Sequence, residues 1–328
     1  MRTKRLIVLL VLAAVLFPFM LNALECSVCS KKIRGQYIKN RKNQSFCSRK
    51  CFNSTLPKCE NCRKICTAGV FTLQNKNFCS KSCMHQTFKC SCCGRGLITF
   101  VTVVNSYGTT AMLCPNCRSL PKCVYCSMPS SLAPLADGRH ICRECSKTAV
   151  KDPQRIRTIF QQVRSDLARM FGYDNRHRIQ LLIVDAQELE KEAHSTYTPT
   201  NGQRMALMKY SEKVQTTRRG RKKSSRVVQT TCQIFVLDSI PEIMLYDVLA
   251  HELTHDFLRH KVGKIRDNAK EEGFCELAAA LYNQKRGAYF LNRAKNANPD
   301  PVYGGGFRTM YSHYRRVKSL HKVLPYLR

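Results

Sequence analysis

The chain has 328 residues, 20 of them cysteines, and its 55 Lys and Arg against 22 Asp and Glu give a formal net charge of +33. Four all-cysteine zinc sites would each add a net charge of about −2, which lowers the total to roughly +25 and leaves the chain strongly basic. We find no helix-turn-helix, histidine-containing finger or RNA-binding motif, and together with an export signal this argues against a nucleic-acid partner.

Residues 1–23 have the pattern of an export signal. A basic start is followed by an apolar run from Leu6 to Phe17, then by Pro18 and a cleavage point after Ala23. The apolar run is short for a membrane span, which needs about 20 residues, although retention as an anchor over residues 6–21 stays open. We therefore expect a signal peptide or short anchor, and a chain that is secreted, periplasmic or lumenal.

Sixteen cysteines form a fourfold repeat of paired doublets. A two-residue spacing lets both thiolates of a doublet reach one metal, and the segment between doublets makes a small hairpin module. Modules this short bury too little apolar surface to fold alone, so zinc would supply folding free energy. We expect two LIM-like double zinc modules of treble-clef or ribbon type, over residues 26–86 and 90–146, with about four structural zinc ions. The expected ligands are Cys26, Cys29, Cys47 and Cys51; Cys59, Cys62, Cys79 and Cys83; Cys90, Cys93, Cys114 and Cys117; and Cys123, Cys126, Cys142 and Cys145.

Disulfides are the alternative for these cysteines, because an exported chain with an even number of cysteines favours them. The near-equal period of the doublets is instead typical of zinc ribbons or LIM domains, although a LIM histidine ligand is missing. Cys66 and Cys92 are left over as extra thiols, alternative ligands or one additional bridge. Modules of this kind bind protein partners or only support a neighbouring domain.

Beyond Cys145 the cysteine density falls, and we expect a second type of domain over residues 150–328, ample for one core. Asp152 and Pro153 predict a helix start, and an apolar stripe follows as far as Gly172. Residues 179–184 and 233–237 are expected strands. The basic run 218–226 is expected as an exposed loop that binds a polyanion or an anionic membrane surface, or that has no partner.

The most informative motif is His251-Glu252-Leu253-Thr254-His255, on a helical pattern that runs over residues 241–259. Residues four apart share a helix face, so His251 and His255 can bind one metal with Glu252 beside it. Catalytic zinc commonly takes two His and one Glu and keeps a position open for water, which makes Glu272 the expected third ligand. We thus expect one catalytic zinc, with Glu252 as the general base. A strand entering a metal helix is zincin-like, and the expected fold class is α+β.

Two further side chains are candidates for supporting roles. Glu276 is one helical turn beyond Glu272 and is expected to accept the second ring N–H of a metal-bound histidine, with Asp256 a weaker candidate. Tyr303 or His313 is a candidate donor to the tetrahedral intermediate of acyl transfer, while Tyr303 could instead pack under the glycines that follow it.

The carboxy-terminal half resembles the plant organ-size regulators of the DA-one group, LIM-bearing peptidases activated by ubiquitin. The resemblance rests on the motifs at residues 135–139, 249–255, 271–275 and 301–308, in that order. The Glu-Gly-Phe step at 272–274 also resembles the third-ligand motif of gluzincin aminopeptidases, which favours Glu272 as the ligand.

The resemblance implies limited endopeptidase cleavage of protein substrates by a domain next to LIM-type modules. The plant proteins carry ubiquitin-interacting motifs where this chain has its export signal, which puts ubiquitin activation in doubt. The first hypothesis is therefore an exported zinc endopeptidase. The alternative is a catalytically inactive zinc scaffold that mediates protein–protein interaction.

Overall fold

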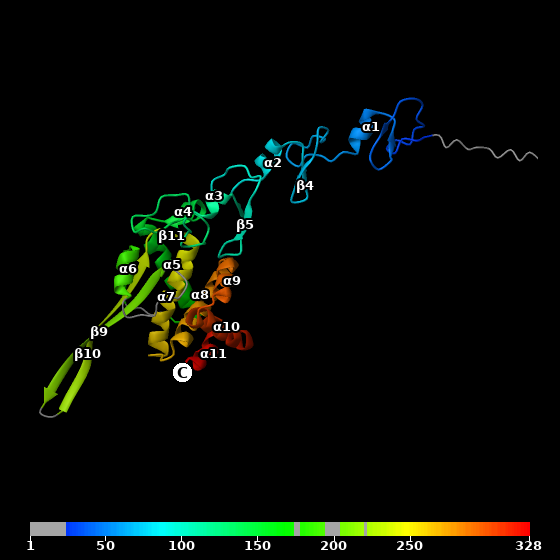
Figure 1. Ribbon diagram of the computed structural model, residues 1–328. Coiled ribbons are helices and arrows are strands. Elements are labelled where there is room, and N and C mark those ends of the chain that lie inside the picture. The colour runs from blue at the N-terminus through cyan, green and yellow to red at the C-terminus, as the bar shows by residue number, and fades with distance from the viewer. Residues whose placement is uncertain (1–23, 174–177, 194–203, 220–221) are drawn as a thin grey trace, which may run out of the picture. The chain divides into compact units, whose positions relative to one another are not determined.

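The computed structural model describes residues 24–173, 178–193, 204–219 and 222–328 (Figure 1). The chain divides into two compact units, Met1–Thr87 and Phe88–Arg328. The predicted export signal lies outside the described residues. In the described part of the chain no helix is both long enough and apolar enough to cross a bilayer.

The first unit holds two small cysteine modules of the same design. In each, a two-stranded antiparallel hairpin is followed by one short helix, and one phenylalanine, Phe46 or Phe78, is fully buried. So small an apolar core cannot offset the entropy lost on folding, so a further source of stability is required. The elements are β1 (Ile38–Lys39), β2 (Ser45–Phe46) and α1 (Arg49–Ser54), then β3 (Phe71–Leu73), β4 (Lys76–Phe78) and α2 (Lys81–Thr87).

The second unit begins with two more cysteine modules. The third module has the hairpin β5 (Val101–Val104) and β6 (Thr110–Leu113), followed by α3 (Pro115–Arg118). The fourth ends in α4 (Arg143–Thr148) and β7 (Ala149–Val150), which pairs with β11 (Ile240–Pro241). The four cysteines of the fourth module belong to the same buried cluster as the large helices of the unit.

Arg139 ties the fourth module to the rest of the second unit. Its guanidinium is 3% exposed, pairs with Asp137 at 2.6 Å and with Asp238, and donates to the Tyr125 hydroxyl at 2.7 Å. Asp137 also accepts the backbone N–H of Ala186 at 3.1 Å. A buried guanidinium is stable only when its donors are satisfied, so the motif at residues 135–139 is a structural junction.

A three-stranded sheet of order β8-β10-β9 forms the next layer. It comprises β8 (Ile179–Val184), β9 (Ala206–Arg219) and β10 (Lys222–Leu237). β10 is parallel to β8 and antiparallel to β9, so β9 is an edge strand. Mixed pairing beside long helices confirms the predicted α+β class.

The prediction of a loop over residues 218–226 was wrong. β9 continues to Arg219 and β10 starts at Lys222, and Figure 1 shows their far halves extending away from the helices as one hairpin. The flanking segments are rich in threonine, and the register pairs Thr216 with Ser225. β-Branched residues favour extended pairing, and this outweighs the preference of a charged run for irregular backbone.

The helices of the second unit carry most of its core. α5 begins where predicted, with the Asp152 side chain accepting from two backbone N–H groups, and ends at Gly172 with φ of 59°. The strand predicted at 179–184 is confirmed as β8. The helices are α5 (Pro153–Phe171), α6 (Ala186–Glu192), α7 (Glu242–Lys261), α8 (Asn268–Lys285), α9 (Tyr289–Ala297), the π-helical η1 (Pro301–Gly305), α10 (Gly306–Val317), α11 (Leu320–Val323) and the 3₁₀ η2 (Leu324–Leu327).

Two glycines let α8 and α10 approach backbone to backbone. A Cβ atom on Gly273 would overlap the backbone of Gly306, and one on Gly306 would overlap the Ala269 carbonyl oxygen. Neither obstacle is the end of a flexible side chain, so neither can move aside. This contact fixes the depth at which α8 lies in the core, and with it the position of the acidic residues next to Gly273.

Gly306→Ala should lower the stability of the second unit by about 1–3 kcal/mol, because overpacking forces the two helices apart. Gly305→Ala is the matched control, since its Cβ would meet its nearest neighbour, the Asp300 carbonyl oxygen, only at 3.8 Å. Differential scanning calorimetry of both variants measures the difference. Equal Tm values for the two variants would show that the close approach is not needed.

Candidate functional site

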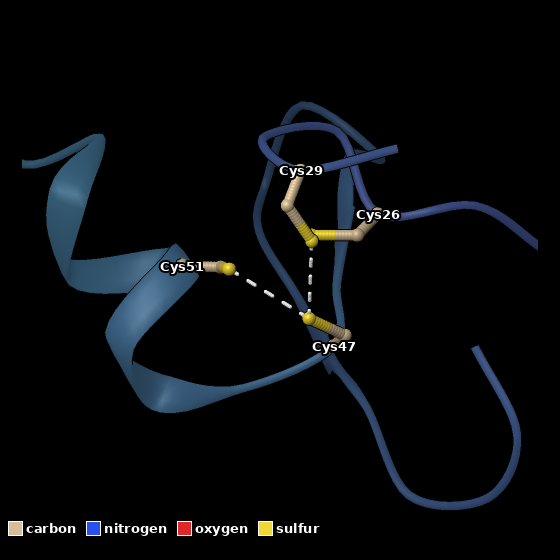
Figure 2. A group of neighbouring side chains, drawn as sticks. All are labelled: Cys26, Cys29, Cys47 and Cys51. Carbon is tan, nitrogen blue, oxygen red and sulfur yellow. Dashed lines mark hydrogen bonds between the residues drawn. The ribbon is translucent and has the colours of Figure 1, made fainter. Parts of the chain in front are cut away.

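The four expected cysteine groups come together as four sulfur clusters. In each cluster the Sγ atoms all lie within 4.8 Å of one another. Cys47 Sγ lies 3.5 Å from Cys29 Sγ and 3.6 Å from Cys51 Sγ (Figure 2). A tetrahedral zinc with bonds near 2.3 Å separates its sulfurs by about 3.8 Å. A disulfide would need about 2.05 Å.

The other three clusters have similar spacing, and their separations also fit a metal. They are Cys62–Cys79 at 3.6 Å, Cys79–Cys83 at 3.5 Å, Cys93–Cys114 at 4.0 Å and Cys126–Cys142 at 3.5 Å. All four groups can therefore bind a metal ion, and zinc suits an all-sulfur set.

Backbone N–H groups favour thiolate at the first cysteine of three clusters. They lower the pKa of Cys26 to about 6, through the amides of Cys47 and Cys29. Burial raises the pKa of Cys59 and Cys90, but amides within each cluster outweigh it and bring both to about 6. Because thiolate is the form that binds metal, these clusters hold a ready ligand at neutral pH.

The two cysteines left over by the repeat are not cluster members. Cys66 is buried, and this burial raises the pKa of its thiol, which therefore stays neutral. Cys92 is partly exposed, and both are free thiols.

The HExxH helix brings its two histidines onto one face beside α8. His251 Nε2 lies 3.3 Å from His255 Nε2, and Glu272 Oε2 lies 3.0 Å and 3.5 Å from these two nitrogens. Zinc with bonds of about 2.0–2.1 Å spaces tetrahedral donors by roughly 3.3–3.4 Å. The three donor atoms expected from the sequence thus match the dimensions of a zinc site.

Cys275 is a competing donor in the same place. Its Sγ lies within 4.8 Å of nitrogens of His251 and His255. Burial raises the pKa of the Cys275 thiol, which disfavours the thiolate that a metal needs. Burial also raises the pKa of Glu272, but the two histidines outweigh this effect and hold it well below the usual range. The lowered pKa of Glu272 and the raised pKa of Cys275 favour Glu272 as the candidate third ligand.

Each histidine has a second carboxylate on its other ring nitrogen. Glu276 Oε1 lies 3.3 Å from His251 Nδ1, as the expected role of Glu276 requires. Glu271 Oε1 lies 3.1 Å from His255 Nδ1, a contact that the sequence reasoning missed. The sequence signal for this contact was the pair of adjacent acids at 271 and 272, followed by a third acid one helical turn later at 276. Asp256, the weaker candidate, instead accepts from Tyr210.

A buried lysine on α9 completes the acidic network. Lys295 Nζ pairs with Glu276 and lies 3.0 Å from Asp247, while Asn283 donates to Asp247 at 2.6 Å. Burial lowers the pKa of Lys295, but the two carboxylates raise it well above its usual value. The same pairing holds the pKa of Glu276 low against the effect of burial. Sequence reasoning did not find Lys295.

Glu252 and Tyr303 face the same cleft as the histidines. Burial raises the pKa of Glu252, and the nearby histidines only partly oppose this. Tyr303, on η1, lies with its ring 6.2 Å from that of His251, and burial raises the pKa of its hydroxyl. The hydroxyl is therefore protonated and able to donate. His313 instead stacks on Tyr326, with 3.9 Å between ring centroids.

The cleft has a volume of about 900 Å³. The edge strand β9 and the Arg204 segment before it form one side, and the metal-site residues lie along α7 and α8. Arg204 is 8% exposed and its charge lowers the pKa of Glu252, against the larger effect of burial. The cleft thus combines a candidate metal site, a buried carboxylate and the edge strand β9.

Comparisons with known proteins agree with the resemblance seen in the sequence. A family model described as "DA1-like: Protein DA1" matches residues 176–288, which include the HExxH helix and Glu272. Protein DA1 of Arabidopsis thaliana is 25% identical over 244 residues, which cover 57% of this chain and 45% of that protein. LIM domain-containing protein HDR3 of Oryza sativa subsp. japonica is 23% identical over 268 residues, covering 63% and 53%. The chain spans about half the length of these two relatives, and its match to the DA1-like family model lies within residues 176–288.

Proposed function

We propose that the chain is a zinc-dependent endopeptidase with a zincin-like catalytic domain. The observation that carries the proposal is the set of donor separations of 3.0, 3.3 and 3.5 Å among His251, His255 and Glu272. Such spacing fits a single tetrahedral ion with one position free. The buried carboxylate of Glu252 in the same cleft supports hydrolysis rather than a purely structural role for the metal.

Glu252 is proposed as both base and acid. Zinc, when bound, supplies Lewis-acid polarisation of the scissile carbonyl and makes water more acidic. Glu252 accepts a proton from the attacking water and then gives it to the amine as the C–N bond breaks. A carboxylate whose pKa is raised by burial suits both transfers, because it binds a proton more readily than an exposed carboxylate does. The protonated Tyr303 hydroxyl is the candidate donor to the oxyanion.

A protein or peptide in extended form is the proposed substrate. β9 is an edge strand of the sheet, and its residues Ala206 to Met208 line the cleft beside the catalytic helix. An edge strand offers backbone donors and acceptors that an extended peptide can pair with. This gives affinity with little dependence on substrate sequence.

The names of the relatives, one of them LIM domain-containing, support protein–protein interaction by the cysteine modules. The modules of the first unit are the proposed platform for such a partner. The hairpin that carries Arg218 and Arg226 remains the expected site for a polyanion or an anionic membrane surface, and export remains an expectation from the sequence.

Glu252→Gln should reduce hydrolysis of fluorescein-labelled casein by about 10²–10⁴-fold, because the amide cannot accept the proton of water. Zinc content should stay unchanged, since Glu252 is not a proposed ligand. Glu190→Gln, an exposed change on α6, is the control and should behave as wild type. Hydrolysis that persists in the Gln variant would remove Glu252 from the mechanism.

Elemental analysis of the purified chain should give about five zinc ions, four in the cysteine clusters and one at the catalytic site. His255→Ala should reduce this to about four. About one zinc in the unmodified chain would mean that disulfides hold the cysteines. Four zinc ions without casein hydrolysis would favour the alternative, an inactive zinc scaffold for protein partners.

Glu276→Ala should weaken zinc binding at the catalytic site about 10–100-fold, because His251 loses the carboxylate that orients its ring. Competition with a chelator of known affinity measures this, with Glu190→Ala as the control. Zinc affinity and turnover equal to those of the control would show that Glu276 does not support the metal site.

A further inference from the structure

Two cysteine modules of the second unit form part of the active-site cleft. Ser106 and Tyr107 line it from the tip of the third module's hairpin, between β5 and β6. Val124 and Tyr125 line it from the first doublet of the fourth module. The cleft therefore includes side chains from outside the region that carries the HExxH helix.

The sequence of the hairpin tip fixes its conformation. The Asn105 side-chain oxygen accepts from the backbone N–H of Tyr107 at 3.0 Å and of Thr109 at 2.8 Å. Gly108 adopts a φ of 78°, which side chains other than glycine's rarely allow. The turn is thus closed from within and presents Tyr107 in one direction.

Tyr107 joins three elements. Its hydroxyl donates to the Tyr125 carbonyl oxygen at 2.6 Å and lies 2.8 Å from Met244 Sδ on α7. Its ring packs edge-on against Phe290 on α9, with 4.9 Å between centroids. Met244 is seven residues, or about two turns, before His251 on the same helix. The hairpin tip is therefore held at a defined distance from the metal site.

Ser106 adds a second attachment. Its backbone N–H donates to the Cys126 carbonyl oxygen at 3.0 Å, and its hydroxyl lies 2.7 Å from that of Ser127. The hairpin of the third module is thereby joined to the fourth module, which is part of the core. These contacts form a wall, rather than a loose lid, along the cleft.

The wall is uncharged. Tyr107 and Val124 are partly exposed, Met244 contacts Tyr107, and Val248 and Leu291 also line the cleft. Lys295, which also lines the cleft, lies 3.0 Å from Asp247 and pairs with Glu276, so its charge is satisfied within the protein. Arg259, which also lines the cleft, pairs with Glu212, so its charge is satisfied too. An aromatic ring beside aliphatic groups suits an apolar side chain.

We propose that Tyr107 and Val124 form a substrate subsite for an apolar side chain of the peptide, so that the third and fourth cysteine modules set specificity. The inference rests on the proposed peptidase function and adds to it a recognition site outside the metal-binding helices. It also couples the two types of metal site, because the hairpin that presents Tyr107 belongs to the module closed by Cys90, Cys93, Cys114 and Cys117.

Tyr107→Ala should raise KM for fluorescein-labelled casein about tenfold and leave kcat within about twofold, because it removes a contact made equally in the ground and transition states. Tyr107→Phe should keep a KM close to wild type, since the ring remains. Val104→Ala is the matched control on the same hairpin: its side chain is 66% exposed and does not line the cleft.

Binding is measured separately by fluorescence anisotropy of the labelled casein in the Glu252→Gln background, where Tyr107→Ala should raise Kd by the same factor. Equal KM and Kd for Tyr107→Ala and Val104→Ala would overturn the subsite. A loss of kcat without a change in KM would reduce Tyr107 to a structural support and also overturn it. If the unmodified chain does not cleave casein but Tyr107→Ala still weakens casein binding, the peptidase proposal fails and the subsite stands. If the unmodified chain neither binds nor cleaves casein, both proposals fail.

Discussion

The candidate metal site depends on the balance between buried acidic and basic side chains around His251 and His255. Four acidic side chains, Asp247, Glu252, Glu272 and Glu276, lie buried or nearly so around two imidazoles and one ammonium. Unpaired charges in such surroundings cost several kcal/mol each, so the cluster depends on the ion pairs that Asp247, Glu272 and Glu276 make with these cations. Burial lowers the pKa of both histidines, yet the nearby carboxylates, with Cys275 at His255, outweigh it and raise them well above normal. Two imidazolium protons and one divalent zinc ion carry the same charge. Metal can therefore replace these protons without disturbing the outer pair of Glu276 and Lys295.

This charge balance requires α8 to lie at a precise distance from α7. Backbone contact between α8 and α10 sets that distance. Gly273 follows Glu272 directly, and its contact with Gly306 fixes α8 against α10. An outward shift of α8 by the size of a methyl group would open the spacing of about 3 Å between Glu272 and the two histidines. Gly304 approaches the Asn298 carbonyl just as closely, and so holds η1 with Tyr303 beside the cleft. Glycines in the two carboxy-terminal motifs thus act through packing rather than chemistry.

The features that the sequence predicted correctly are local in character. The cap at Asp152, the strand at 179–184 and the two-residue cysteine spacing each depend on neighbours a few positions apart. Glu271, Lys295 and Tyr107 were missed because their contacts join separate elements, and no short motif records such a contact. The run at 218–226 was misjudged because its charge pointed to a loop, while pairing between β9 and β10 is decided by the segments on both sides.

The four cysteine clusters differ in how far they are built into the fold. One cysteine is buried in each of the first two clusters, two in the third and all four in the fourth. A buried cluster cannot release its metal without opening the surrounding core, whereas an exposed one can exchange it by small local motions. The fourth cluster lies in the same core as α5 and α7, and Arg139 joins its module to the turn that precedes β11 and α7. The first two clusters are thus the better proposed surfaces for other proteins, whereas a metal bound to the fourth would stabilise the core that it shares with α5 and α7.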